Sequence, residues 1–196
     1  VCSSDLGIHG WAGASAHREA VLGGRPAHEG RAWAKGAEGE IAVGRVLDAA
    51  EGVRALHDRA VPGSTANIDH IAVAPSGVLV IDAKHYAGAP RLVRLGDGSI
   101  LRLRVGGADR TELVAGARRQ LGIVAEALDE RDVPIRAVLC FVDADWEPGN
   151  ERGFLIDGVG VTSPAGLGEL LAMPGPLSAA RVEELHARLR ARLAAA

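Results

Sequence analysis

The sequence predicts a mixed α/β domain, and three observations lead to this prediction. Helical stretches alternate with short strand-like runs, in the order helix, three strands, hairpin, helix, strand and helices. The length of 196 residues suits one domain of ordinary size. Hydrophobic residues make up 47% of the chain, which is too high for a disordered protein, yet no run of 18 apolar residues could span a membrane. We therefore expect one domain without a membrane association.

The chain begins with a stretch that has no regular apolar spacing. Residues 1–33 are rich in Gly, Ala and His, and we expect them to form a flexible arm. The first residue is Val, and residues 1–6 match what the end of a common sequencing adapter encodes in frame. We expect residues 1–6 to be a non-native assembly artefact and the native protein to continue upstream, where a further domain can be missing. Residues 34–50 have a helical apolar period, and Gly52 ends this helix.

The middle of the chain has the spacing of strands. Its three strand-like runs are residues 53–59, 67–74 and 78–84, with Pro75-Ser76-Gly77 between the last two. Residues 91–95 and 100–104 flank Gly96-Asp97-Gly98-Ser99, which is typical of a hairpin turn.

The rest of the chain contains helices and two further strands. Residues 109–129 are helical, residues 135–142 form an apolar run typical of a buried strand, and residues 159–162 form a short strand. Two final helices are predicted to begin after Ser163, with Pro164 at the first helical position, and after Ser178.

Charge and cysteine content exclude several classes of protein. The net charge is −3 and the pI is about 6.2, which argues against a nucleic-acid coating protein with a pI above about 9. A nuclease is not excluded, because an acidic metal site lowers the net charge. Cys2 and Cys140 form neither a disulfide framework nor a CxxC pair, and no signal peptide is visible. We expect a cytoplasmic protein.

Lysine is rare in this chain, and its positions are informative. Of the 22 basic residues only Lys35 and Lys84 are lysines. The ammonium of lysine is a compact charge whose pKa shifts on burial, whereas arginine is a permanently charged planar fork. Lys35 and Lys84 are therefore the first positions to examine for chemistry. The alternative is chance retention, which composition alone does not exclude.

The predicted first helix carries a glutamate near its apolar stripe. At 100° per residue, Glu40 lies within about 60° of Val43 and Leu47, while Glu38 points to the opposite side. A buried carboxylate is costly unless it is paired, hydrogen-bonded or bound to a metal. Two readings stay open: Glu40 is a buried functional acid, or it lies at the edge of the stripe and reaches water.

The two strands around Ser76-Gly77 bring charged groups together. A two-residue turn at Ser76-Gly77 would place Lys84 opposite Asp69, with Asp82 on the same face. Two Asp carboxylates suit a hard cation such as Mg²⁺ (or Mn²⁺), and a neighbouring lysine can orient an attacking water. The alternatives are a structural ion pair with a spare acid, or a three-residue turn that moves Asp69 to the other face.

Several spaced motifs carry a family resemblance. They are Lys35-Gly36-Ala37-Glu38-Gly39-Glu40, then Asn67-Ile68-Asp69-His70, Pro75-Ser76-Gly77-Val78, and Ile81-Asp82-Ala83-Lys84-His85-Tyr86-Ala87-Gly88. In this order they resemble the nuclease-related domain (NERD) family, from about residue 35 to residue 128. That family is similar to the PD-(D/E)xK nucleases. The resemblance implies a restriction-endonuclease-like fold with a central mixed sheet flanked by helices. It also implies a nuclease-related domain at residues 34–145, and we expect residues 146–196 to pack on this domain.

The resemblance also implies roles for individual residues. Asp69 and Asp82, with the Ala83 carbonyl, would bind the divalent ion, Glu40 would be a further acidic member, and Lys84 would position the nucleophilic water. Gln120 resembles a glutamine often found on the following helix. Asp82 stands where many of these nucleases have Glu, and His85 where the family often has Asn, so metal preference can differ.

The predicted hairpin carries a second group of charges. With a turn at Asp97-Gly98, Arg91, Arg102 and Arg104 share one face, and two of them lie directly opposite each other. This face is either a track for nucleic-acid phosphates or a solvated basic surface.

The function we expect is Mg²⁺-dependent hydrolysis of phosphodiester bonds in DNA. The alternative is a catalytically inactive nuclease-like module that binds nucleic acid or a protein partner. The presence of Glu40, Asp69, Asp82 and Lys84 together favours catalysis.

Overall fold

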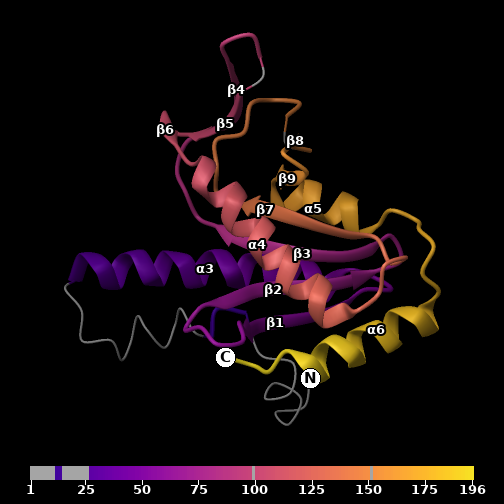
Figure 1. The fold of residues 1–196 in the computed structure, drawn as a ribbon. Coiled ribbons are helices and arrows are strands. Elements are labelled where there is room, and N and C mark those ends of the chain that lie inside the picture. The colour runs from indigo at the N-terminus through magenta and orange to yellow at the C-terminus, as the bar shows by residue number, and fades with distance from the viewer. Residues whose placement is uncertain (1–11, 15–26, 99, 151) are drawn as a thin grey trace.

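The computed structural model describes residues 12–14, 27–98, 100–150 and 152–196 (Figure 1). Within these residues a six-stranded sheet has the order β1-β2-β3-β7-β9-β8, and a three-stranded sheet has the order β4-β5-β6. The strands are β1 (Arg54–Ala60), β2 (Asn67–Ala74), β3 (Gly77–Lys84), β4 (Pro90–Leu95), β5 (Ile100–Val105), β6 (Ala108–Asp109), β7 (Ile135–Phe141), β8 (Phe154–Ile156) and β9 (Val159–Thr162). The helices are α3 (Ala27–Ala49), α4 (Thr111–Leu128), α5 (Pro164–Leu171) and α6 (Ala179–Arg192).

The large sheet is mixed and is covered by helices on both faces. Strands β1, β2 and β3 are antiparallel, whereas β3, β7 and β9 are parallel neighbours. The parallel step from β3 to β7 is made through the small sheet and α4, as a parallel pair requires a long crossover. The predicted α/β fold with a central mixed sheet flanked by helices is confirmed.

The strands β2 and β3 are buried on both faces, which explains their nearly continuous apolar sequences. On one face, α3 and α5 pack through Val43, Leu47 and Leu167 against Leu79 and Ile81. The opposite face is covered by α4 and α6. A third apolar cluster, which includes Leu103, Phe141 and Ile156, lies between the small sheet and β7.

The predicted helix starts near the C-terminus are confirmed. The Ser163 hydroxyl accepts a hydrogen bond from the Gly166 amide at 3.1 Å, with Pro164 in the first turn of α5. The Ser178 hydroxyl accepts from the Arg181 amide at 3.3 Å at the start of α6. Each serine partners one of the amide groups that a helix N-terminus leaves free.

The first helix begins earlier than predicted. Helix α3 starts at Ala27, so residues 27–33 are helical and do not belong to the arm. This segment has no apolar stripe to reveal a period, but Ala, Glu and Arg favour helix by propensity alone. Of the other residues predicted to form the arm, residues 12–14 are described. Residues 1–11, which include residues 1–6, and residues 15–26 lie outside the described residues.

The turn between β2 and β3 differs from the predicted one. Ala74 lies opposite Gly77, so Pro75-Ser76 forms the turn in place of Ser76-Gly77. Proline has a φ suited to the first central turn position, and Gly77 is needed in the strand, where a Cβ would lie 2.3 Å from the Pro134 carbonyl oxygen. The pairing moves by two residues, which brings Asp82, and not Lys84, opposite Asp69. A shift of two preserves the faces, so the predicted shared face is correct.

The described residues contain no helix that is both long and apolar enough to cross a membrane. Cys140 is fully buried in β7 as a free thiol.

Candidate functional site

The candidate site lies where β3 ends. Asp82 and Lys84 are two residues apart on β3, so their side chains leave the same face of the sheet. The pairing of β2 with β3, continued by one residue, places Asp69 opposite Asp82. The Asp69 carboxylate accepts a hydrogen bond at 2.9 Å from the Ala83 amide. The three charged residues predicted to converge on one face are therefore brought together.

The ammonium of Lys84 bonds directly to the carboxylate of Asp82. Asp82 is only 7% exposed, and Lys84 is partly buried. Burial by itself lowers the pKa of Lys84, but the charges of Asp82 and Asp69 outweigh it and raise the pKa above its usual value. Lys84 is therefore a cation at neutral pH, held against the carboxylates.

Helix α3 delivers Glu40 to the same end of the sheet. Gly39 packs against His85, where a Cβ would lie 3.2 Å from the His85 Cβ, and the His85 ring bonds to the Lys35 carbonyl at 3.0 Å. These contacts hold the helix beside the end of β3. Glu40 is 8% exposed, which decides between the two readings in favour of a buried acid, and Glu38 is exposed as predicted.

The environment of Glu40 disfavours its charge. The pKa of Glu40 is raised to about 7. Burial is the largest cause and the charges of Asp58 and Asp82 add to it, whereas a hydrogen bond from the Gly13 backbone and the charge of Lys84 act against it. Its Oε2 atom is buried without a hydrogen-bond partner among the described residues. An unsatisfied buried acceptor is costly, so this oxygen is able to accept a further hydrogen bond or to bind a cation.

Asp69 has the same kind of environment. Burial raises the pKa of Asp69 well above its usual value, and the charges of Asp82 and Glu40 add to this, while Lys84 opposes it. Three carboxylates therefore share one ammonium, which leaves excess negative charge in a poorly solvated place. A cation placed there would relieve this repulsion.

Asp58 is a further acidic residue that the sequence analysis did not identify. In the β1–β2 ladder, His57 pairs with His70 and Arg59 pairs with Ile68. Asp58, between His57 and Arg59, therefore lies across from Asp69. Asp58 is 1% exposed and has a left-handed φ of 51°, and its carboxylate accepts from the Asn67 amide group at 2.6 Å. The sequence gives no sign of a role for Asp58, because residues 53–59 are predicted as a strand from their apolar residues alone.

Gln120 lies on the stripe of α4 that faces the sheet, between the buried residues Ala117 and Val124. Its Oε1 atom is buried and has no hydrogen-bond partner within the described ranges. The role of Gln120, and that of the Ala83 carbonyl, stays a prediction.

The predicted hairpin arginines belong to the small sheet and not to the acidic cluster. Arg91 lies opposite Arg104 and Val93 opposite Arg102, as the predicted register requires. Arg91 pairs with Glu147 at 2.7 Å, and Arg102 with Asp109 at 3.6 Å.

Comparison with known proteins gives one match. The model of the nuclease-related domain family (NERD) matches residues 35–142, which include Glu40, Asp69, Asp82 and Lys84. No curated protein matches the chain, and no solved structure matches it. The matched region is more than half of the chain and contains β1, β2, β3, the small sheet, α4 and β7. The chain therefore belongs to the nuclease-related domain family.

Proposed function

We propose that this protein is a divalent-metal-dependent nuclease that hydrolyses phosphodiester bonds in DNA. The observation that carries the proposal is the acidic cluster at the end of β3, in which Glu40, Asp69 and Asp82 share the single ammonium of Lys84. The family assignment supports a nuclease-related function.

The donor set fits a magnesium or manganese ion. All three side chains offer carboxylate oxygens, the ligand type preferred by hard cations, and one oxygen of Glu40 is buried without a partner among the described residues. Burial and mutual repulsion raise the pKa values of Glu40 and Asp69, and a cation bound among the carboxylates would offset that repulsion, which supports the proposal.

The side chains must adjust to hold an ion. In the described part of the chain no three His, Cys, Asp or Glu side chains are already grouped as ligands of one metal. The Asp82 oxygen that would serve as a ligand is bonded to Lys84. We infer that Lys84 moves off Asp82 when the site is loaded, and that Glu40 and Asp69 lose their protons.

Each residue then has a separate task. Asp69, Asp82 and Glu40 would hold the ion, with the Ala83 carbonyl as a further oxygen. When bound, the ion supplies charge stabilisation for the phosphoryl oxygens. Lys84, released from Asp82, orients a water toward the phosphorus and offsets the charge that develops on the phosphate. The Ala83 amide fixes the carboxylate of Asp69, so this ligand keeps its orientation.

A cleavage assay tests the proposal. Purified protein is incubated with supercoiled plasmid and with short duplexes, in Mg²⁺, in Mn²⁺ and in EDTA, beside Asp82→Ala and Lys84→Met. Glu38→Gln is the matched control because Glu38 is exposed on the helix that carries Glu40. We expect cleavage by the wild type and by Glu38→Gln that needs a metal, and none by the two site variants.

Cleavage that is absent, or equal in all variants, would refute the enzymatic function. Binding to DNA without cleavage would indicate the inactive nuclease-like module instead. The proposal also includes a cytoplasmic location, which cell fractionation tests, and a protein partner, which co-purification tests.

A further inference from the structure

The outward face of the β4–β5 hairpin has an unusual composition. The residues on this face come in three opposed pairs, which are Arg91 with Arg104, Val93 with Arg102, and Leu95 with Ile100. Leu95 and Ile100, next to the turn, are 46% and 45% exposed. The face therefore carries arginines at the end near Pro90 and aliphatic side chains next to the turn. None of these side chains belongs to a buried apolar cluster of the described chain.

The other face of the hairpin explains why the outward face is free. Leu92, Leu101, Leu103 and Val105 pack against β7 and α4 in the apolar cluster beneath the small sheet. The hairpin is therefore anchored along its inner side, while its tip projects beyond the rest of the described chain, at the top of Figure 1. Packing within the described chain explains the apolar residues on the inner side of the hairpin, but it does not explain the exposed Leu95 and Ile100 at its tip.

The base of the hairpin is fixed close to the end of β3. A Cβ on Gly88 would lie 2.3 Å from the Gly106 Cα, so the backbone before β4 touches the backbone after β5. The Gly88 amide also donates to the Asp145 carboxylate at 3.1 Å. Only a short loop joins Lys84, the last residue of β3, to Pro90, the first of β4. The base of the hairpin is therefore joined directly to the end of β3 that carries Asp82 and Lys84.

The hairpin is strongly basic in an acidic protein. Residues 90–105 contain four arginines and one aspartate, a net charge of +3, whereas the chain has a net charge of −3. Two arginines directly opposite each other repel unless an anion lies near them. Their present partners are weak ones: Arg91 forms an exposed ion pair with Glu147, and Arg104 donates to the Gly107 carbonyl.

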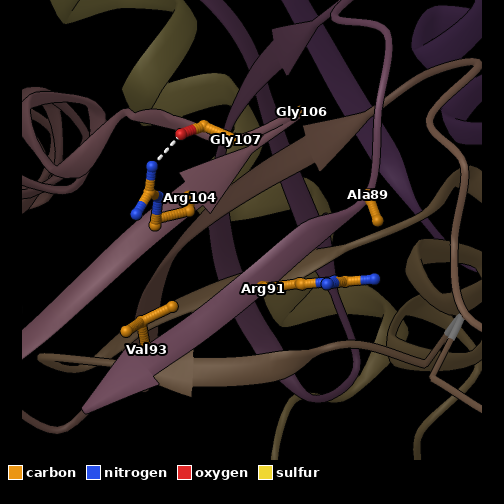
Figure 2. A pocket seen from close by; sticks show the side chains of 6 residues that line it. All are labelled: Ala89, Arg91, Val93, Arg104, Gly106 and Gly107. Atoms are coloured by element: carbon orange, nitrogen blue, oxygen red, sulfur yellow. Dashed lines mark hydrogen bonds between the residues drawn. The ribbon is translucent and has the colours of Figure 1, made fainter.

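A hollow of about 450 Å³ lies between these arginines. Figure 2 shows its lining, with the Arg104 side chain turned toward Gly107 and the Arg91 side chain extended in another direction. The remaining lining residues are small or apolar, and they are Ala89, Val93 and Gly106. A phosphate group in this hollow would contact both guanidinium groups once the two side chains turn toward it.

We propose that this outward face is a duplex-DNA clamp, in which Arg91 and Arg104 hold a backbone phosphate and Leu95 and Ile100 enter the groove. A two-stranded ribbon fits a DNA groove, and exposed aliphatic side chains can wedge between base steps. The hairpin has no aromatic residue on which single-stranded bases could stack, so duplex DNA is favoured over a single strand. The inference deepens the proposed nuclease function and rests on it for the nature of the substrate.

The test is a binding measurement in EDTA, where cleavage does not occur. Fluorescence anisotropy with a labelled 30-base-pair duplex is followed at several salt concentrations for the wild type and three double variants. These are Arg91→Gln with Arg104→Gln, Leu95→Ser with Ile100→Ser, and the control Arg131→Gln with Arg136→Gln. The control changes the net charge by the same amount as the hairpin arginine variant, at exposed residues remote from the hairpin in sequence.

Each variant has its own expected signature. Loss of Arg91 and Arg104 should weaken binding about tenfold and reduce the salt slope by roughly one to two, since each phosphate contact contributes about 0.9. Loss of Leu95 and Ile100 should weaken binding about fivefold at an unchanged salt slope, because no charge is removed. The control should bind within about twofold of the wild type. A single strand of the same length should bind more weakly than the duplex.

The outcome separates this inference from the proposed function. Duplex binding in EDTA that depends on the hairpin, together with no cleavage in the Mg²⁺ or Mn²⁺ assay, supports the clamp and refutes the nuclease. Cleavage by a wild type whose hairpin variants bind DNA normally refutes the clamp and leaves the nuclease. A wild type that does not bind the duplex, or that binds a single strand better, also overturns the clamp. All the substituted side chains are partly or fully exposed, so circular dichroism should show unchanged folding.

Discussion

The carboxylate of Asp69 accepts a hydrogen bond at 2.9 Å from the backbone amide of Ala83. Ala83 lies between Asp82 and Lys84, so this bond joins the acid on β2 to the pair on β3 at a fixed distance. The site is held by the sheet itself and not by a flexible loop, which is the arrangement that keeps ligands in place.

Asp69→Asn should stabilise the metal-free protein and weaken the metal site. The amide oxygen of Asn can still accept from Ala83, while the repulsion that raises the pKa of Asp69 disappears. We expect the free energy of unfolding to rise by roughly 1 kcal/mol at pH 8 in EDTA, and Mg²⁺ affinity to fall at least about tenfold. Urea unfolding and calorimetric titration measure the two effects. Asp132→Asn, at an exposed position, should change neither.

The stability of the metal-free protein should fall as pH rises from about 4.5 to about 7. Burial raises the pKa of Glu40 from about 4.5 to about 7, so the native state binds more protons than the unfolded state in this window. The cost of ionising Glu40 is complete above the native pKa and amounts to at most about 3 kcal/mol. Urea unfolding of Glu40→Gln in EDTA should show a shallower decline, since the raised pKa of Asp69 remains and the lowered pKa of His70 acts in the opposite direction.

Glu38→Gln is the control for this pH profile, because Glu38 is exposed on the same helix. Its curve should run parallel to that of the wild type. Parallel curves for Glu40→Gln and the wild type would show that Glu40 does not titrate in this way.

The two lysines should respond differently to the same substitution. Lys84→Met should reduce cleavage by about 10²- to 10⁴-fold, the usual contribution of a group that positions or activates a nucleophile. It should not weaken Mg²⁺ binding, because it removes the ammonium that occupies Asp82. Lys35 is exposed, and among the described residues its recorded contact is the bond from its carbonyl to His85, so Lys35→Met should cleave within about twofold of the wild type. Weaker metal binding by Lys84→Met would contradict this reading.

Two glycines should give opposite effects when changed to alanine. Gly77 has a φ of 127°, and a Cβ there would lie 2.3 Å from the Pro134 carbonyl oxygen, so Gly77→Ala should destabilise the fold by at least about 1–3 kcal/mol. Gly122 lies inside α4 with no atom within 4 Å of a built Cβ, so Gly122→Ala should stabilise it by about 0.5–1 kcal/mol. Thermal unfolding measures both. A neutral Gly77→Ala would mean that the turn can move away from Pro134.

The main elements were predictable because apolar spacing reports which side of an element is buried. Strands β2 and β9 have the predicted bounds, and the register of the β4–β5 hairpin follows from its turn residues. The sequence could not reveal the first turns of α3, since no apolar stripe marks them, nor the short strands β6 and β8, which exist only by pairing with β5 and β9.

The sequence by itself determined which residues are the chemical candidates and that Asp69, Asp82 and Lys84 share a face, because side chains alternate with a period of two. It also placed Glu40 on a buried stripe, because a helix has a period of 3.6. Only the tertiary structure decided that Asp82, and not Lys84, lies opposite Asp69, since that register depends on the contact between Gly77 and Pro134. It alone brought Asp58 to the cluster, because the pairing of β1 with β2 joins residues that no local pattern connects.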